Sequence, residues 1–284
     1  MILPLVALLV GLSAYPFVYM LYMSAHTYNL AQWTPPRYVG TANFVQMARD
    51  STMRASLVFT GLMAGIALPV ELLLGLGLAL LLRGVVGERV WRSLLLLPMM
   101  IPAVVAGIAW KMLYNFEFGP VNYALSKFGL ERISWLGDFT AARIGLIIID
   151  IWQWTPFVFL VLYAGLQNVP RDLVESATVD GAGGWAVTRF IELPFLAPLI
   201  WVVLIVRLID ILKLFDIVYM TTFGGPGSAT HPLSFYIYKV GVSFGWDVGY
   251  GSALSMLLLA VITLLTNVLI RILHIDRLLE LERA

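Results

Sequence analysis

Residues 175–194 read ESATVDGAGGWAVTRFIELP and separate two of the most apolar stretches of the chain. The whole chain has 284 residues, of which 60% are hydrophobic and only 12% are charged. An ordinary soluble domain carries about 25% charged residues, so this composition cannot build a surface that faces water on all sides. A polar segment with three glycines is unusual in such a chain. It indicates an ordered element that lies outside the membrane.

The apolar runs around this segment predict an all-α integral membrane protein, built as one transmembrane domain over residues 1–284. Crossing about 30 Å of hydrocarbon takes roughly 20 helical residues, whereas a barrel strand takes roughly 9–11. We expect six transmembrane helices, at 3–23, 56–82, 93–114, 144–166, 195–220 and 249–273. Six spans place both termini on one side, but the Lys and Arg residues of the loops are almost balanced. The positive-inside rule therefore does not orient the chain.

Several classes of function are disfavoured by composition and motifs. A net charge of +1 argues against nucleic acid as a partner, and the absence of cysteine excludes disulfides and Cys-ligated metals. The G-x-S-x-G match at 241–245 lacks the strand–turn–helix context and the His and acid partners of a hydrolase. No G-x-x-x-x-G-K-[ST] loop is present to cradle nucleotide phosphates. We predict no catalytic residue, no metal site and no cofactor bound by this chain.

The segment 168–194 predicts a short helix, a glycine turn and a second helix. Pro170 suits the first turn of a helix, and the helix should end near Asp180 and Gly181, because glycine readily adopts the left-handed conformation that closes helices. A second helix can begin at Trp185. A protruding helix–turn–helix of this kind has a shape that can enter a groove on another protein. The alternative is a surface loop with helical propensity and no partner.

The spacing of Glu175, Ala177 and Gly181 ahead of Ile191-x-Leu193-Pro194 resembles the EAA signature of the membrane permeases of binding-protein-dependent ABC importers. Other segments are similar to the carbohydrate branch of that family, which includes permeases for maltose, trehalose or glycerol phosphate. These segments are YVGTANF (38–44), LLLLPMMIPAVVAGIAWKMLYN (94–115), WQWTPF (152–157), AGLQNVP (164–170), KLFDIVY (213–219), FGGPG (223–227) and GYGSALS (249–255). Together they cover nearly the whole chain in the expected order.

The resemblance implies that the segment between spans four and five is a cytoplasmic coupling helix that sits on an ATPase subunit, with Glu175, Ala177, Asp180 and Gly181 as the coupling residues. It also implies a multi-pass protein of the cell inner membrane with both termini in the cytoplasm. Ser176 replaces an alanine of the motif. The basic tail usual before the first span is missing, so we expect the natural start to lie upstream.

The partners implied by the resemblance are a second permease subunit, two ATP-binding cassette subunits that hold ATP and Mg, an extracytoplasmic solute-binding protein and the membrane lipid. The solute would be a sugar or a sugar-like molecule, moved by alternating access without covalent chemistry in this chain. A different class of function remains, a secondary transporter that acts without an ATPase. Such carriers usually show an internal repeat, and none is visible in the sequence.

Ionisable residues at membrane depth are costly and usually face the protein interior or a watery cavity. The fifth span carries Arg207, Asp210, Lys213 and Asp216, each three residues after the last. Opposite charges at this spacing are neighbours on a helix, so the ladder can neutralise itself. One interpretation is structural pairing within this ladder, particularly for Lys213 and Asp216 near the outer end of the span. Arg207 and Asp210 lie deeper and are candidates for the solute path, and the alternative for them is an internal ion pair.

The fourth span places Asp150, Trp154 and Phe157 on one helix face. A carboxylate accepts hydrogen bonds from sugar hydroxyls, and aromatic rings pack against the apolar faces of sugars. The resemblance matches these three positions to sugar-contacting positions of the maltose permease. The alternative is an aromatic stripe packed beside a buried acid.

Two features keep the identity of the solute open. On the fifth span, the positions that match sugar-contacting positions of the maltose permease include Arg207, Ile211 and Leu214. None of these is the small polar residue found there, so the substrate geometry does not carry over. Glu71 and Lys111 are single charges within spans that have no partner nearby in the sequence, and we expect both to be paired for structural reasons.

Overall fold

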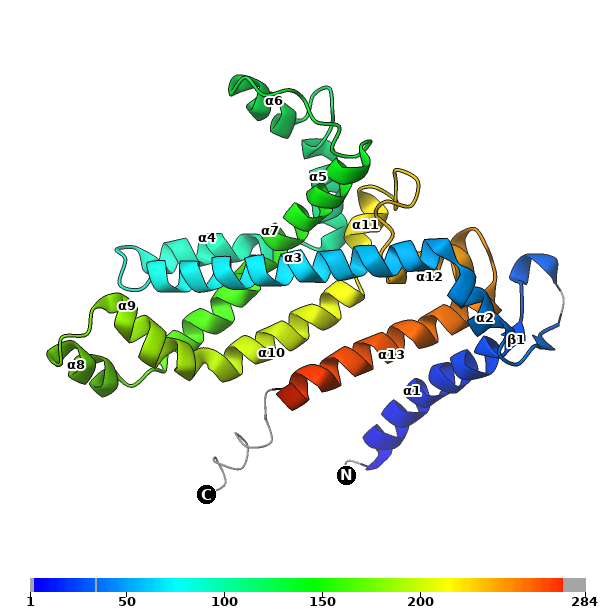
Figure 1. Ribbon diagram of the computed structural model, residues 1–284, viewed down its shortest axis with the longest axis horizontal. Helices are drawn as coiled ribbons and strands as arrows, with labels where there is room; N and C mark the ends of the chain where they lie inside the picture. The colour runs from blue at the N-terminus through cyan, green and yellow to red at the C-terminus, as the bar shows by residue number, and fades with distance from the viewer. Residues whose placement is uncertain (1–2, 34, 273–284) are drawn as a thin grey trace.

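The computed structural model describes residues 3–33 and 35–272, and these residues are mostly helical (Figure 1). The long helices are α1 (Leu3–Ser24), α3 (Ser51–Leu81), α7 (Phe139–Gln167), α10 (Leu193–Leu212) and α13 (Val248–Ile272). The shorter α-helices are α2 (Ala42–Arg49), α4 (Glu88–Met100), α5 (Ala103–Leu113), α6 (Pro120–Lys127), α8 (Arg171–Val179), α9 (Gly184–Val187), α11 (Asp216–Met220) and α12 (Leu233–Tyr238). A 3-10 turn, η1 (Leu30–Gln32), and two π-helical turns, η2 (Thr188–Glu192) and η3 (Lys239–Ser243), complete the helical elements of the described chain. Strands β1 (His26–Thr27) and β2 (Arg37–Tyr38) pair antiparallel.

Four helical stretches of the described chain are long and apolar enough to cross a membrane: Ser51–Leu81, Phe139–Gln167, Gly184–Met220 and Val248–Ile272. They coincide with four of the predicted spans, except that the last predicted residue, 273, lies outside the described residues. The predicted span 93–114 is the bent pair α4 and α5, and its inclusion raises the count to five. The predicted span 3–23 falls on α1, whose apolar part from Leu8 to Ser24 is shorter. The number of spans by this measure is four or five, and a sixth stays a prediction.

The predicted span 93–114 is broken by 93° between α4 and α5. Pro98 and Pro102 flank the break, and Ile101 between them has extended backbone angles. Proline removes a backbone donor and crowds the preceding turn, so helices commonly break there. The side chain of Gln153 in α7 donates a 3.0 Å hydrogen bond to the carbonyl of Ile101, which lies in the break itself. Beyond the break, α5 packs against α11, and α6 lies at the tip of the molecule beyond it (Figure 1).

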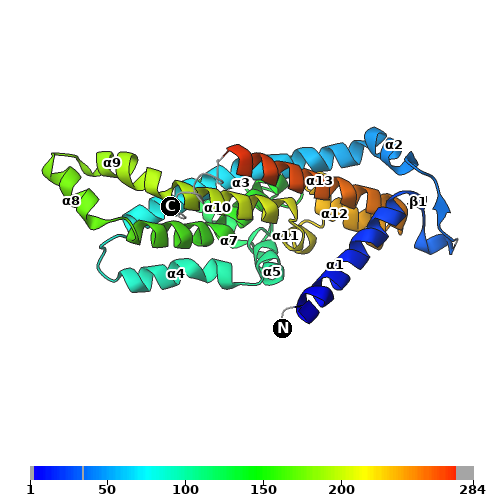
Figure 2. The ribbon, with the colours of Figure 1, turned by 90° about the horizontal axis from the view of Figure 1, so that it is seen from below.

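Helices α3 and α7 cross and pack closely (Figures 1 and 2). Gly75 permits this contact, because a Cβ atom there would lie 2.7 Å from the side chain of Val158 and 2.9 Å from the backbone nitrogen of Phe159. Helix α10 packs on both helices. The buried side chains of the three form two apolar clusters. One includes Phe59, Met63, Ala67, Ile149 and Ile211, and the other includes Ala79, Val158, Leu162, Leu196 and Val203.

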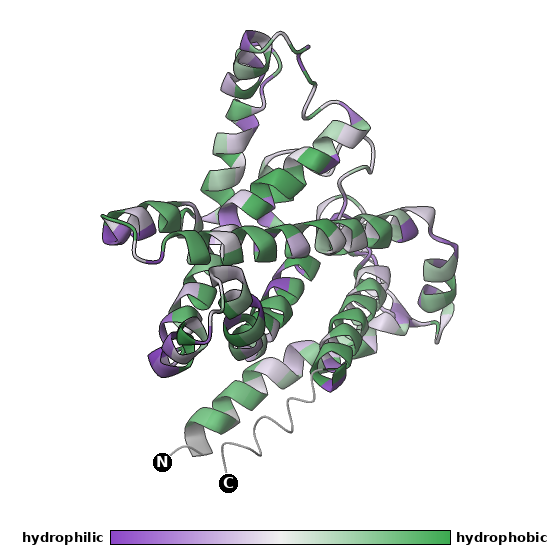
Figure 3. Ribbon diagram, turned by 60° about the vertical axis from the view of Figure 1, so that its left-hand side comes forward, coloured by the Kyte–Doolittle hydropathy of each residue, from purple (hydrophilic) through white to green (hydrophobic). Residues whose placement is uncertain are grey.

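The polar elements of the fold lie at its two ends. Helices α8 and α9 lie at one end of α3, and α2 with the β1–β2 pair lies at the opposite end (Figures 1 and 2). Apolar residues predominate along the long helices, while polar residues gather at helix ends and in connecting segments (Figure 3). Many large apolar side chains on α1, α3 and α5 are exposed. This distribution fits a helical bundle whose sides meet lipid and whose ends meet water.

Candidate functional site

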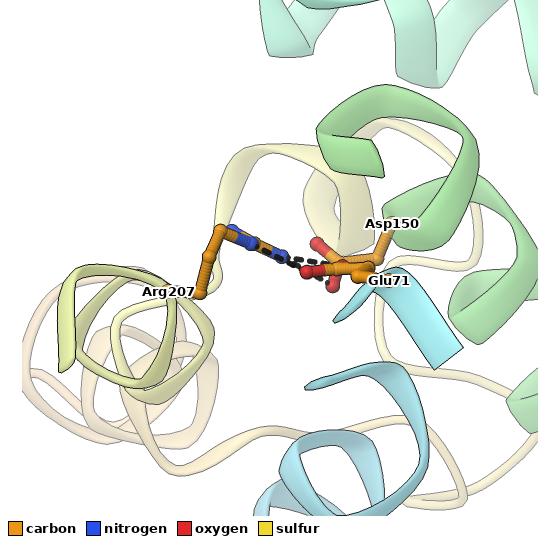
Figure 4. Close-up of polar contacts among 3 residues, drawn as sticks. All are labelled: Glu71, Asp150 and Arg207. Atoms are coloured by element: carbon orange, nitrogen blue, oxygen red, sulfur yellow. Dashed lines mark hydrogen bonds and ion pairs between the residues drawn. The ribbon is translucent and has the colours of Figure 1, made fainter. Parts of the chain in front are cut away.

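A cluster of three charged side chains lies between the two apolar clusters, where α3, α7 and α10 meet. Arg207 of α10 reaches across to Glu71 of α3 and Asp150 of α7 (Figure 4). Its Nε donates to Glu71 at 2.7 Å, and its Nη2 donates to Glu71 at 2.8 Å and to Asp150 at 2.9 Å. Each of the three side chains is 1% exposed. A planar guanidinium with fixed donors suits such a two-pronged contact, and Lys could not reproduce it.

The cluster is neither charge-balanced nor fully hydrogen-bonded. Two carboxyl groups face one guanidinium, and the carboxyl groups of Glu71 and Asp150 also lie side by side (Figure 4). Oδ1 of Asp150 and Nη1 of Arg207 are buried, and neither has a hydrogen-bond partner among the described residues. Buried polar atoms without partners are rare in folded proteins, and bound water or an ion is one explanation for them. The cluster therefore contains one acceptor and one donor that the described residues leave without a partner.

Aromatic rings cover one side of the cluster. The guanidinium of Arg207 lies 4.8 Å from the ring centroid of Trp154, within the range of a cation–π contact. The rings of Trp154 and Phe157 meet edge to face, with centroids 6.4 Å apart. Both rings are only half-buried, whereas Asp150 is fully buried. Asp150, Trp154 and Phe157 thus share one face of α7, as the sequence predicts.

The alternative of an internal ion pair between Arg207 and Asp210 is wrong, although Asp210 and Lys213 of the same ladder do pair. Arg207 binds carboxylates of two other helices, whereas Asp210 approaches Lys213, with 3.8 Å between Oδ1 and Nζ. Both members of this second pair are well exposed, at 36% and 57% of their side chains. Helix α10 ends at Leu212, so Asp216 belongs to the separate helix α11 and cannot extend the ladder. The long Arg207 side chain reaches an adjacent helix more readily than the neighbouring turn of its own.

Glu71 and Lys111, the two single charges within predicted spans, differ in whether the structure pairs them. Glu71 is paired, as predicted, because Arg207 binds both of its carboxylate oxygens. Lys111 on α5 is exposed, and it forms no ion pair within residues 3–33 and 35–272. The prediction of structural pairing is therefore wrong for Lys111, which lies on the helix beyond the bend.

The segment 168–194 folds as the sequence predicts. Helix α8 spans Arg171–Val179, Asp180 caps its end, and Gly181 has a φ of 85°. The amide of Ala182 closes the turn by donating to the carbonyl of Ala177 at 2.9 Å. Helix α9 then leads into η2 and α10. Glu175, Asp180 and Gly181 are exposed, and Ala177 is half-buried, so this corner presents an open surface.

A cleft of about 510 Å³ lies between the segment 168–194 and the end of α3. Its walls include Glu175 of α8, Arg83 after α3, and Glu192 at the start of α10. Arg83 donates to Glu192, whose side chain is only 2% exposed and also accepts a 2.9 Å hydrogen bond from Thr188. This contact joins the C-terminal end of the segment 168–194 to the residues that follow α3, the longest helix.

Residues 71–275 match the family model of the binding-protein-dependent transport system inner membrane component. The chain belongs to this family. The trehalose/maltose transport system permease protein MalF of Thermococcus litoralis is 34% identical over 277 residues, which cover 96% of this chain and 92% of that protein. The sulfoquinovosyl glycerol transport system permease protein SmoG of Agrobacterium fabrum is 38% identical over 275 residues, which cover 95% and 88%.

A solved bacterial ABC transporter involved in the import of the acidic polysaccharide alginate has the same fold. Its chain superposes with a TM-score of 0.84 at 24% identity, covering 96% of this permease and 93% of that chain. The permease is therefore a multi-pass inner membrane component of a transport system, as the resemblance implies, and no enzyme is found among the relatives named here. Membership in a binding-protein-dependent family favours an importer over a secondary transporter.

Sequence reasoning found Asp150, Trp154, Phe157 and Arg207 but placed Glu71 outside the site. The signal was present, because a lone acid in an apolar helix needs a partner at membrane depth. Three ionisable residues on three different spans are a set that can meet in one place. Asp210, by contrast, lies at the edge of the site and is paired with Lys213.

Proposed function

We propose that this permease is one of two transmembrane subunits of an ATP-driven importer for a sugar or sugar-like solute. A second permease, two ATPase subunits that hold ATP and Mg, and an extracytoplasmic solute-binding protein complete the transporter. The observation that carries the proposal is the exposed helix–glycine-turn–helix segment, held to α3 by the Arg83–Glu192 contact in a chain of a binding-protein-dependent family. The names of the relatives support a sugar-like solute.

In this proposal the segment 168–194 lies in the cytoplasm and acts as the coupling element. Closure of the ATPase dimer on ATP moves α8, and the Arg83–Glu192 contact passes the motion to α3. Helices α3, α7 and α10 carry the charged cluster, so a shift of one against the others rearranges the surroundings of Trp154. Asp150, Trp154 and Phe157 line the solute path of the proposal, with Arg207 behind them. Both termini are on the cytoplasmic side.

The orientation can be tested with single cysteines, because the chain has none of its own. Ala177→Cys is placed on α8, and Gln46→Cys on the exposed face of α2 at the opposite end of the bundle. A thiol reagent that cannot cross membranes should label Gln46→Cys in intact cells and Ala177→Cys only after permeabilisation. A cross-linker should join Ala177→Cys to the ATPase subunit. Labelling of Ala177→Cys from outside would reverse the topology and rule out the coupling role.

The path residues can be tested by Trp154→Ala. This change removes a half-buried ring over the cluster, so we expect uptake to fall while the complex still assembles. Leu160→Ala on the same helix is the matched control, because its side chain is exposed and 40% accessible. Normal uptake by Asp150→Ala with Trp154→Ala would show that the stripe is packing alone.

A further inference from the structure

Three exposed arginines lie on elements at the end of the bundle opposite the segment 168–194 (Figure 1). They are Arg37 of β2, Arg49 at the end of α2 and Arg54 in the first turn of α3. Among the residues that the structure describes, none of the three has an acidic partner in an ion pair. This end of the bundle therefore presents positive charge that the fold itself does not neutralise.

The acid between Arg49 and Arg54 is used inside the fold. Oδ1 of Asp50 accepts from two backbone amides in the first turn of α3, and Oδ2 accepts 2.6 Å hydrogen bonds from the hydroxyls of Tyr236 and Tyr250. These contacts fix the start of α3 against the two helices that follow α11. They leave the two neighbouring guanidinium groups exposed.

Helix α2 is held by one face and exposes the other. Asn43 is buried and donates to the carbonyls of Ser24 and His26 at 2.8 and 2.9 Å. Met47, one turn later on the same face, is buried in an apolar cluster. Val45 points away from this face and is 52% exposed. The exposed face of α2 is thus available to a partner, while its buried face fixes its position.

A cleft of about 500 Å³ lies beside this exposed face, lined by Val45, Gln46, Arg49 and Asp50. A guanidinium at a cleft can bind a carboxylate through two parallel hydrogen bonds. Apolar side chains next to arginine are typical of protein–protein interfaces, in which Arg is enriched and Lys is depleted. The cleft therefore fits an acidic side chain on the surface of another protein.

Helix α3 connects this corner with the rest of the transport machinery. Its 31 residues extend roughly 46 Å, which is longer than the roughly 30 Å of hydrocarbon, so part of the helix projects beyond the lipid chains. The same helix carries Glu71 of the charged cluster, and Arg83 follows its other end. A partner seated on the start of α3 would act on the helix that the Arg83–Glu192 contact holds at its far end.

We infer that the α2–α3 corner, residues 42–54, is a docking surface for an acidic patch of the extracytoplasmic solute-binding protein, and that Arg49 and Arg54 supply the charges that recognise it. This inference rests on the proposed function, in which such a protein delivers the solute. Docking at this corner acts on α3 and through it on ATP hydrolysis.

The test measures ATP hydrolysis by the complete complex in nanodiscs of neutral lipid, as a function of the concentration of its purified, solute-loaded binding protein. Arg49→Glu with Arg54→Glu should raise the concentration for half-maximal stimulation about tenfold and leave the maximal rate unchanged, because like charges now oppose docking. High salt should weaken docking to the wild type and have much less effect on this double variant. Lys127→Glu reverses an exposed charge on α6 and is the matched control, with no change expected.

A second readout does not depend on charge. Gln46 lines the cleft, and the chain has no cysteine of its own, so Gln46→Cys gives this surface one reactive thiol. The binding protein should slow the labelling of Gln46→Cys by a water-soluble maleimide about tenfold, because docked surfaces exclude solvent. Lys127→Cys should react at the same rate with and without the binding protein.

An unchanged half-maximal concentration in the double variant, with unchanged labelling of Gln46→Cys, overturns the inference and leaves the import function standing. Protection of Gln46→Cys without a shift in the double variant removes the role of the two arginines. A Gln46→Cys thiol that is unreactive before the binding protein is added shows that α2 lies against lipid or another subunit, which also overturns the inference. If the double variant does not assemble, the labelling decides alone. If the binding protein does not stimulate the wild-type complex at all, the proposed import function itself is contradicted.

Discussion

Arg207 and Glu71, 136 residues apart in the sequence, form two hydrogen bonds at 2.7 and 2.8 Å in the centre of the helical bundle. Asp150 of a third helix joins the same guanidinium. Helices α3, α7 and α10 are thus joined by hydrogen-bonded charged groups, and separating these groups would cost free energy. A buried pair need not raise stability above that of an apolar core, but breaking it leaves a charge stranded.

The first prediction is that losing the charge of Arg207 destabilises the complex more than losing the charge of Glu71. Arg207→Gln leaves two adjacent acids with no cation, and loss of one partner of a buried pair costs about 3–5 kcal/mol. Glu71→Gln leaves a balanced pair and an amide oxygen that can still accept from Arg207, so we expect a loss of about 1 kcal/mol. The yield of assembled complex should therefore fall far more in Arg207→Gln. It is measured by co-purification at constant expression.

A neutral version of the cluster provides the control. Glu71→Gln, Asp150→Asn and Arg207→Gln together remove every charge, and we expect the triple variant to recover most of the yield lost in Arg207→Gln. Asp210→Asn should not rescue Arg207→Gln, because Asp210 is paired with Lys213. Rescue by Asp210→Asn would show that the contact network of Arg207 is wrong.

A second prediction concerns pH and the start of α3. Asp50 caps this helix through Oδ1, and its Oδ2 accepts 2.6 Å hydrogen bonds from Tyr236 and Tyr250. Burial favours the neutral carboxyl, but these hydrogen bonds outweigh it and hold the pKa of Asp50 below its usual value. The stabilisation is fully present above the unfolded pKa of about 3.9 and is lost as the pH falls through the lower folded pKa.

Asp50→Asn should therefore lower the unfolding temperature of the purified complex at pH 7 and remove part of its dependence on acid pH. The loss at pH 7 should be about 2 kcal/mol, as for hydrogen bonds to a charged group. Asp138→Asn is the matched control, because Asp138 caps α7 in the same manner and no Tyr hydroxyl donates to it in the described chain. Equal losses in the two variants would remove the role assigned to Tyr236 and Tyr250.

A third prediction places the mechanical link at Arg83 and Glu192. Glu192→Gln weakens a charged hydrogen bond at the base of the coupling segment, and such a bond is worth about 1.5–3 kcal/mol. We expect solute-stimulated ATP hydrolysis to fall about tenfold while the ATPase still co-purifies. Arg89→Gln changes an exposed arginine in the first turn of α4 and should have little effect. Undiminished stimulation in Glu192→Gln would exclude this contact as the link.

The sequence predicts the elements of this fold better than the contacts between them. Long apolar runs require membrane helices, and Pro170 and Gly181 mark the turns around α8, because both effects are local. The 93° bend is only partly visible, since Pro98 and Pro102 show where a helix can break but the hydrogen bond that Gln153 of another helix donates within the break is a tertiary contact. The partners of Arg207 likewise depend on tertiary packing, which local sequence patterns do not show. Neighbours at i,i+3 favoured Asp210, whereas helix packing selected Glu71 and Asp150.

The glycine turn after α8 gives the fourth prediction. Gly181 has a φ of 85°, and no atom lies within 4 Å of a Cβ placed there, so a side chain would meet conformational strain and no steric clash. Left-handed backbone costs a non-glycine residue roughly 1–2 kcal/mol, and a β-branched residue tolerates it least. Gly181→Val should deform the turn. Gly183→Ala is the matched control, because Gly183 has a φ of −71° and equally open surroundings.

The most direct test of the whole account is the amount of solute accumulated per ATP hydrolysed in proteoliposomes that hold the complete complex with its binding protein. We predict that the wild-type complex accumulates solute only when ATP is present on the coupling-segment side. We also predict that Gly181→Val lowers accumulation per ATP at least tenfold, while Gly183→Ala retains the wild-type value. Accumulation driven by an ion gradient without ATP, or a wild-type ratio in Gly181→Val, would contradict ATP-driven import through this segment.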